Sequence, residues 1–227
     1  MNESKFKKIY LISIWTITFL VVIFCTIRYF AFRDYANSDN AMISDRKTFG
    51  NETIRSLEID SENSDINIVR GDSLYVDYSV PKSDYLKVEM KDGVLSITQG
   101  KGINSFIFKN AVGKGKITVS IPNEAELLNA DLTVDMGDIA ISDMKLKQLD
   151  LDAAMGNVEM KKSYVTDGEI DTDMGNVDLD IDFESLSIIS DMGDVDITTN
   201  TDLNKSALEI DNDMGTCKVN GIEWKEE

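Results

Sequence analysis

The sequence predicts an all-β protein, a β-solenoid of coils about 19 residues long that follows one N-terminal transmembrane helix. Three observations support this fold class. The dipeptide Met-Gly recurs with spacings of 19, 19, 18 and 22 residues. Apolar and polar residues alternate on both sides of each Met-Gly, which is the period of a β-strand. A repeat of this length is typical of solenoids, in which each repeat forms one coil.

An apolar, uncharged segment covers residues 9–27, and we predict a transmembrane anchor over residues 9–30. As a helix, the uncharged segment spans about 28 Å, close to the hydrocarbon thickness of a bilayer. Residues 1–8 contain three lysines, which favours a cytoplasmic tail. A cleaved signal peptide is the alternative, but bulky residues follow the apolar segment where small ones are typical. We therefore expect a single-pass protein of the cell membrane with its C-terminal domain outside the cytoplasm.

The segment 31–52 is polar and without periodicity, which indicates a linker, and residues 53–227 are expected to form the extracytoplasmic domain. Within this domain, residues 57–68 fit the register of the later repeats and predict a first coil or its cap. Further strands are predicted at 75–80, 85–90, 94–98, 105–108 and 116–121. Lys91-Asp92-Gly93 predicts a hairpin turn between two of them.

The Met-Gly repeats occupy residues 128–222, and each predicts a strand, a bend at the glycine and a second strand. The repeated pairs are Met136-Gly137, Met155-Gly156, Met174-Gly175, Met192-Gly193 and Met214-Gly215. Glycine suits the bend because it tolerates positive φ. We predict that the methionines fill gaps in the core beside the bend. A thioether ladder that would suit Cu(I) is the alternative for this column, and an up-and-down arrangement of hairpins is the alternative fold.

The outward positions of the repeats are acidic. Residues 131–227 carry 25 acidic and 7 basic side chains, so their net charge of −18 equals that of the whole chain. Stacked like charges cost on the order of 1 kcal/mol per neighbouring pair even in water, which suggests that a cation uses them. The candidate ligands are Asp135, Asp173, Asp191, Asp213, Asp138 and Asp194. Calcium is one hypothesis, cationic peptides or envelope proteins are another, and a solvated face that prevents aggregation is the third.

Composition excludes several function classes. The chain has no histidine, which excludes His-based triads and His-ligated zinc, and its acidic balance disfavours nucleic acid. Cys25 and Cys217 are not expected to pair, and Cys217 is predicted to be a small buried apolar residue. A carbohydrate-active enzyme is the least favoured alternative, because the acids lie in exposed columns and no arginine follows Arg70. We predict no catalytic residue and, calcium aside, no cofactor.

Several motifs resemble a known family. They are the run Ser64-Asp65-Ile66-Asn67-Ile68, the turn Asp92-Gly93-Val94-Leu95-Ser96-Ile97, the strand end Val119-Ser120-Ile121-Pro122 and the repeated Gly-Asp/Asn-Ile/Val. Over residues 53–222 they resemble the bacterial "putative adhesin" β-strand-repeat family of unknown function, and the whole chain is similar to LiaG-type membrane-anchored envelope proteins. Family members often have Ser-Gly where this chain has Met-Gly. The resemblance implies an outward-facing β-solenoid and no catalytic residues.

We therefore predict a non-catalytic, membrane-anchored binding or scaffold module outside the cytoplasm, linked to the cell-envelope stress response. An adhesin-like surface protein and a calcium-stabilised module are the main alternatives. The sequence leaves the oligomeric state open.

Overall fold

The computed structural model describes residues 18–19, 21–26, 41–50, 52–101, 113–125 and 127–224. The chain divides into two units, Met1–Ala41 and Met42–Glu227. In the first unit, residues 18–19 and 21–26 are helical. Within the described ranges, no helix is both long enough and apolar enough to cross a membrane. The predicted tail at 1–8, most of the predicted anchor at 9–30 and the predicted strand at 105–108 lie outside the described residues.

The second unit is built from β-strands alone in its described parts, as the sequence predicted. The strands are β1 (Met42–Thr48), β2 (Ser56–Ser61), β3 (Ser64–Gly71), β4 (Tyr75–Pro81), β5 (Asp84–Lys91), β6 (Val94–Lys101), β7 (Gly115–Pro122), β8 (Asn129–Met136), β9 (Ile139–Ser142), β10 (Lys145–Met155), β11 (Val158–Met174), β12 (Val177–Met192), β13 (Val195–Thr198), β14 (Ala207–Met214), β15 (Cys217–Val219) and β16 (Ile222–Glu223).

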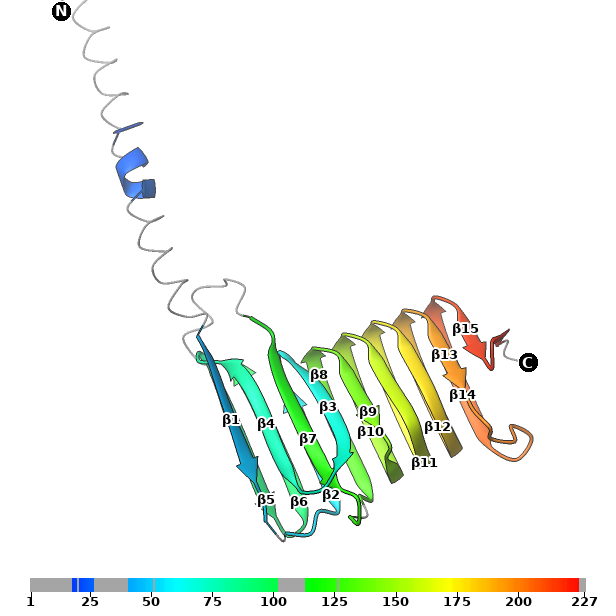
Figure 1. Cartoon of the computed structure of the whole chain (residues 1–227). Helices are drawn as coiled ribbons and strands as arrows, with labels where there is room; N and C mark the ends of the chain where they lie inside the picture. The colour runs from blue at the N-terminus through cyan, green and yellow to red at the C-terminus, as the bar shows by residue number, and fades with distance from the viewer. Residues whose placement is uncertain are drawn as a thin grey trace, which may run out of the picture. The chain divides into compact units, whose positions relative to one another are not determined.

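The Met-Gly region winds as a stack of coils with parallel strands on two sides (Figure 1). One side, which we call the long-strand side, consists of parallel strands paired in register. They are β8, the later parts of β10, β11 and β12, and β14. On the other, β9, the first residues of β11 and β12, β13 and β15 pair in register. β11 and β12 each pass through a corner and so belong to both sides. The parallel pairing excludes the up-and-down arrangement of hairpins.

The predicted first coil is confirmed, and it lies inside the stack. β2 pairs in parallel with β8, so that Ile59 lies beside Leu132, and β3 pairs with β9, so that Ile66 lies beside Ile139. On their other edges β2 and β3 pair with β6 and β7, which form a further coil that comes later in the sequence. The first coil is therefore enclosed by two others, although it precedes both along the chain.

Antiparallel strands lie on the outer edges of the coil formed by β6 and β7. β5 pairs with β6 through the predicted hairpin, where Lys91 lies opposite Val94. Asp92 and Gly93 between them have φ of 53° and 85°, the left-handed pair that a two-residue type I′ hairpin requires. On the other side, β4 pairs with β7 and then with β1.

Strand β1 corrects the prediction that residues 31–52 are a linker. All seven of its side chains are exposed, so the segment lacks the apolar alternation by which a strand is recognised in sequence. Backbone pairing with β4 holds it in place, from Met42 opposite Pro81 to Thr48 opposite Tyr75. The Arg46 guanidinium adds a paired contact to the Asp77 carboxylate, with both N···O distances at 2.5 Å.

The core runs between the two sides and is filled by the predicted inward columns. The column three residues after each methionine is buried at Ile139, Val158, Val177 and Val195, each 1% exposed. Cys217 continues this column but is only partly buried, and it lies on β15, the last parallel strand among the described residues. Burial raises the pKa of its thiol, with the nearby Asp196 adding to the effect.

The methionine column is half-buried at Met136 and exposed from Met155 onward, which overturns the prediction that it fills the core. Met155, Met174 and Met192 are 42–43% exposed and Met214 is 60% exposed. The apolar alternation breaks at the corner, where Asp173 and Met174 are consecutive exposed residues and core packing resumes at Val177. The chain there turns around the core, so the residue before the glycine lies on the convex side. The prediction had continued the inward–outward alternation of the strand through the corner, and that alternation would place the methionine side chain inside.

Candidate functional site

The glycines of the Met-Gly pairs stack directly on one another along the corner of the coils. Their φ angles lie between 148° and 158°. A Cβ atom built on Gly137 would lie 1.9 Å from the carbonyl oxygen of Ser64, and one on Gly156 would lie 1.9 Å from that of Gly137. The same contact, at 1.8 Å, recurs in the next three coils. Glycine is therefore required at the corner both by its φ and by the close approach of the next backbone.

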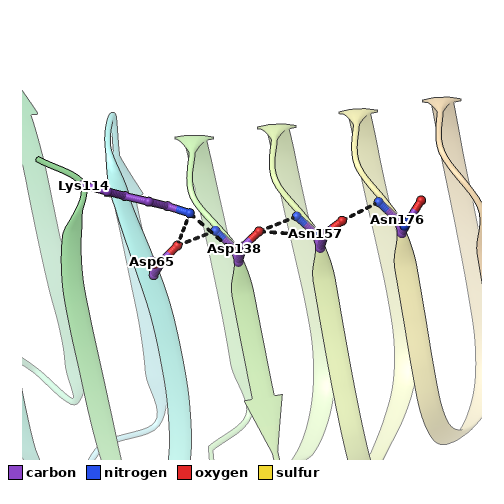
Figure 2. A network of polar contacts seen from close by, with 5 residues as sticks. All are labelled: Asp65, Lys114, Asp138, Asn157 and Asn176. Carbon is purple, nitrogen blue, oxygen red and sulfur yellow. Dashed lines mark hydrogen bonds and ion pairs between the residues drawn. The ribbon is translucent and has the colours of Figure 1, made fainter. Parts of the chain in front are cut away.

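A continuous chain of hydrogen bonds, which we call the Asx ladder, follows this corner (Figure 2). In each coil a side-chain Oδ1 accepts a hydrogen bond from the backbone N–H two residues after the methionine of the next coil. Asp65 accepts from Asp138 at 2.8 Å, Asp138 from Asn157 at 2.9 Å and Asn157 from Asn176 at 3.0 Å. Asn176 then accepts from Asp194, and Asp194 from Thr216. The ladder thus satisfies backbone donors that the corner removes from strand pairing.

Lys114 closes the first end of the Asx ladder. Its Nζ lies 2.5 Å from Asp65 Oδ1 and 3.1 Å from Asp138 Oδ2. Burial opposes the charge of Lys114, but the hydrogen bonds to these two carboxylates outweigh it and raise the lysine pKa. The pKa of Asp138 is lowered, first because the N–H of Asn157 donates to it and then because of Lys114. The N–H and hydroxyl of Thr216 lower the pKa of Asp194 in the same way.

Two of the predicted cation ligands, Asp138 and Asp194, are therefore members of the Asx ladder. The sequence pattern predicts both on an outward acidic column but does not reveal their structural role. A signal was available, because the position after each corner glycine is Asp, Asn, Asn and Asp in four successive repeats. Aspartate and asparagine share a side-chain oxygen at the same distance from the backbone, and that oxygen is what the ladder uses.

The other four predicted ligands lie on the long-strand side, on what we call the acidic face. This face consists of the outward carboxylates of β8, β10, β11, β12 and β14. They are Asp131, Asp135, Asp150, Asp152, Asp167, Glu169, Asp171, Asp173, Asp191, Glu209, Asp211 and Asp213. The outward positions between them carry no lysine or arginine, and no ion pair among the described residues involves an acid of this face.

Like charges are stacked on the acidic face. Asp152 and Asp171 are direct register partners on β10 and β11. The pKa of Asp171 is raised by partial burial first, and then by the carboxylates of Asp152, Asp173 and Asp191. In the part of the chain that the structure describes, no three His, Cys, Asp or Glu side chains are placed to hold a metal ion together. The acidic face is thus an extended surface of one sign.

The methionines of the five Met-Gly pairs form a second column in strict register, which we call the methionine row. Met136 is paired with Met155, Met155 with Met174, Met174 with Met192 and Met192 with Met214. The spacing of the Met-Gly pairs predicts the repeat, but the strand alternation wrongly predicts these side chains in the core. The row borders the acidic face, because an aspartate of that face directly precedes four of its five members: Asp135, Asp173, Asp191 and Asp213.

Two grooves of about 690 and 820 Å³ lie at another corner of the coils and share Asp143, Lys145 and Tyr164. Charges of both signs are interleaved there, in contrast to the acidic face. Arg70 forms part of the first groove, and its guanidinium donates to the carbonyl oxygens of Pro122, Ala125 and Asp143. Burial lowers the pKa of Arg70, and the Asp143 carboxylate opposes that effect. Arg70 thus fixes the connection between β7 and β8.

Stacked coils of parallel strands with glycine corners define a solenoid-like repeat protein. The chain belongs to the Toastrack DUF4097 family, whose sequence model matches residues 54–223. This agrees with the family resemblance of the sequence motifs and covers the whole coil stack from β2 to β16. No match was found among curated proteins.

Three solved structures illustrate what the chain is similar to. A "putative cell adhesion protein" from Clostridium sporogenes ATCC 15579 has 11% identity and a TM-score of 0.44 over 79% of this chain and 98% of that chain. A "putative adhesin" from Bacteroides fragilis NCTC 9343 has 13% identity and a TM-score of 0.41 over 79% and 97%. A "putative adhesin" from Parabacteroides distasonis ATCC 8503 has 13% identity and a TM-score of 0.34 over 80% and 98%.

Proposed function

We propose that the chain is a non-catalytic binding module, held at the membrane by residues 9–30, that presents its acidic face to cationic partners outside the cytoplasm. The observation that carries the proposal is the composition of that face: stacked carboxylates on five strands with no basic residue between them. Cationic peptides or basic segments of envelope proteins are the ligand class that this surface favours. A role in the envelope-stress response would follow if such peptides act on the envelope.

The energetics support a ligand more than a purely structural role. Repulsion between stacked carboxylates raises the free energy of the folded state, and Asp152, Asp173 and Asp191 add to the partial burial that raises the pKa of Asp171. A fold selected for stability alone would place lysines in alternate outward positions, since opposite charges across neighbouring strands are favourable. The opposite side of the coils follows that pattern in part, since Lys161 on β11 is the register partner of Asp180 on β12 and also pairs with Glu159 of its own strand. A bound cation would relieve the repulsion on the acidic face.

The proposal is tested by binding of a fluorescent oligolysine to the full chain in uncharged detergent. Asp152→Asn, Asp171→Asn and Asp173→Asn together are expected to weaken binding several-fold. The matched control neutralises three acids of the opposite side, with Glu159→Gln, Asp178→Asn and Asp180→Asn, and is expected to change binding far less. Because surface charges are screened by salt, the affinity should fall steeply between low and high ionic strength.

Equal losses in the two triple variants, or binding that does not depend on salt, would contradict the proposal. Calcium is tested with the same proteins, by comparing melting temperatures in calcium and in chelator. A rise in the parent that is lost only with the acidic-face variant would make calcium the cation used. Self-association that depends on protein concentration, without oligolysine binding, would instead favour an adhesin-like module.

A further inference from the structure

The methionine row has no explanation in core packing, because its side chains are 42–60% exposed from Met155 onward. Two buried methionines of the same domain, Met144 and Met160, show the ordinary placement, at 1% exposure each. An exposed strand end beside a charged surface would more commonly carry a polar residue. The same apolar thioether instead occupies this position in five successive coils.

The fold itself does not require methionine there. Ser64 of the first coil takes the place of the corner glycine, since its carbonyl oxygen meets the Cβ position of Gly137 as each glycine carbonyl meets the next. The residue before Ser64 is Asn63, and that coil packs within the stack like the others. The close approach of the next backbone requires glycine at Gly137 and its four equivalents, whereas the first coil, with Asn63 and Ser64, is built without either member of the Met-Gly pair. The repetition of methionine is therefore a property of the surface.

The row brings thioether groups together at a spacing suited to one metal ion. Parallel register partners on adjacent strands lie about 4.8 Å apart. A methionine side chain has three rotatable bonds, so the sulfur atoms of two or three consecutive coils can converge on a common point. Thioethers are neutral, soft ligands that select Cu(I) over hard cations such as calcium. Neighbouring carboxylates on Asp173, Asp191 and Asp213 raise the local concentration of any cation.

We propose that the methionine row binds a soft monovalent metal ion, Cu(I), between the thioethers of consecutive coils. The site is centred on Met155, Met174 and Met192, which have methionine neighbours on both sides. This site differs from the acidic face, which is proposed to bind oligolysine, because the thioether ligands carry no charge. An apolar protein partner fits the row less well, since a carboxylate directly precedes Met174, Met192 and Met214 and would be desolvated by it.

The test uses the full chain in detergent with both cysteines replaced, because a thiol binds Cu(I) by itself. Cys25→Ala removes an exposed thiol. Cys217→Val replaces the second thiol with the residue type of its register partner, Val195. Cu(I) is titrated anaerobically in competition with a chromophoric Cu(I) chelator. The test variant combines Met155→Leu, Met174→Leu and Met192→Leu, which keep the apolar volume and remove the sulfur. The control combines Met42→Leu and Met90→Leu, on β1 and β5 and away from the row.

The parent and the control are expected to take Cu(I) from the chelator, and the triple variant to bind at least tenfold more weakly. X-ray absorption at the copper edge should show sulfur ligands in the parent. Unchanged binding by the triple variant, or absence of binding by the parent, would overturn the proposal. A third outcome would also overturn it: loss of Cu(I) binding in the double variant Asp173→Asn with Asp191→Asn, but not in the leucine variant. That result would assign the metal to carboxylates. Circular dichroism confirms that each variant is folded, and oligolysine binding by the triple variant keeps this test separate from the proposed function.

Discussion

Gly156 lies directly against Gly137 of the preceding coil, so closely that a Cβ atom on Gly156 would stand 1.9 Å from the Gly137 carbonyl oxygen and 2.6 Å from its carbonyl carbon. The neighbour is backbone, and it lies between β8 and β9, which both pair with strands of the next coil, so it cannot move away without breaking the stack. The spacing between coils at this corner is thus set by the absence of a side chain.

Gly156→Ala is therefore expected to destabilise the domain by about 3 kcal/mol, through both backbone strain and steric overlap. Gly221→Ala is the matched control, because Gly221 also has a positive φ, of 74°, but no atom lies within 4 Å of its Cβ position. Its cost should be about 1 kcal/mol, from backbone strain alone. Chemical denaturation of both variants measures the difference, and equal costs would show that the close approach is unimportant.

Asn157→Ala removes a central member of the Asx ladder. The N–H of Asn176 loses its acceptor, and Asp138 loses the donor group of the amide. We expect a loss of about 1 kcal/mol in the free energy of unfolding, the usual net value of such a bond at a partly solvated site. Gln148→Ala, at an exposed position within β10, serves as the control and should have little effect. A similar loss in both variants would argue against a specific role of the ladder.

The carboxylates of the Asx ladder make stability depend on pH. The folded-state pKa values of Asp138 and Asp194 lie below the unfolded value of about 3.9. A depressed pKa contributes stability that is fully present above the unfolded pKa and is lost as pH falls through the folded pKa. Asp138→Asn with Asp194→Asn should therefore reduce the loss of melting temperature below pH 4. An unchanged acid transition in the double variant would refute this assignment.

Asp171 is expected to act in the opposite sense. Its folded-state pKa is raised, so the ionised form costs stability at neutral pH, and the cost disappears as pH falls below the unfolded value. Asp171→Asn should raise the melting temperature at pH 7 and low salt. The gain should shrink in high salt and vanish near pH 3. A lower melting temperature at pH 7 would mean that the carboxylate has a favourable partner.

The exposure of the methionine row is testable by oxidation. Dilute hydrogen peroxide converts accessible methionine to the sulfoxide and spares buried side chains. Met174 and Met192 should be oxidised much faster than Met144 and Met160, which are 1% exposed. Peptide mass spectrometry of the folded protein gives the four rates. Comparable oxidation rates for the two pairs would show that the side chains of the methionine row are buried in the core.

Short-range patterns predicted most of the fold. The alternation around Leu132 and Ile139 identifies two strands and their inward faces, and the repeated glycine identifies the corner between them. The hairpin at Asp92-Gly93 and the coil at residues 57–68 were recognised for the same reason. In each case the signal lies within a few residues of one chain segment, where side-chain periodicity and backbone preference act together.

The candidate surfaces were only partly predictable. The sequence placed Asp173 and Asp138 on outward columns alike, although one belongs to the acidic face and the other donates and accepts in the Asx ladder. That difference depends on which backbone N–H of the next coil lies beside each carboxylate. Spacing in sequence gives the coil length but not the rotation of the chain at the corner.

The sequence by itself determined the repeat, the all-β class, the inward columns and the concentration of negative charge in residues 131–227. Only the tertiary structure decided that the methionines face solvent, that β1 is a strand without a single buried side chain, and that the first coil lies between two later ones. The physical reason is the same in each case. These features depend on how the chain rotates at Gly137 and its equivalents and on pairing between distant strands. Local side-chain periodicity encodes neither the direction of that rotation nor the choice of partner strand.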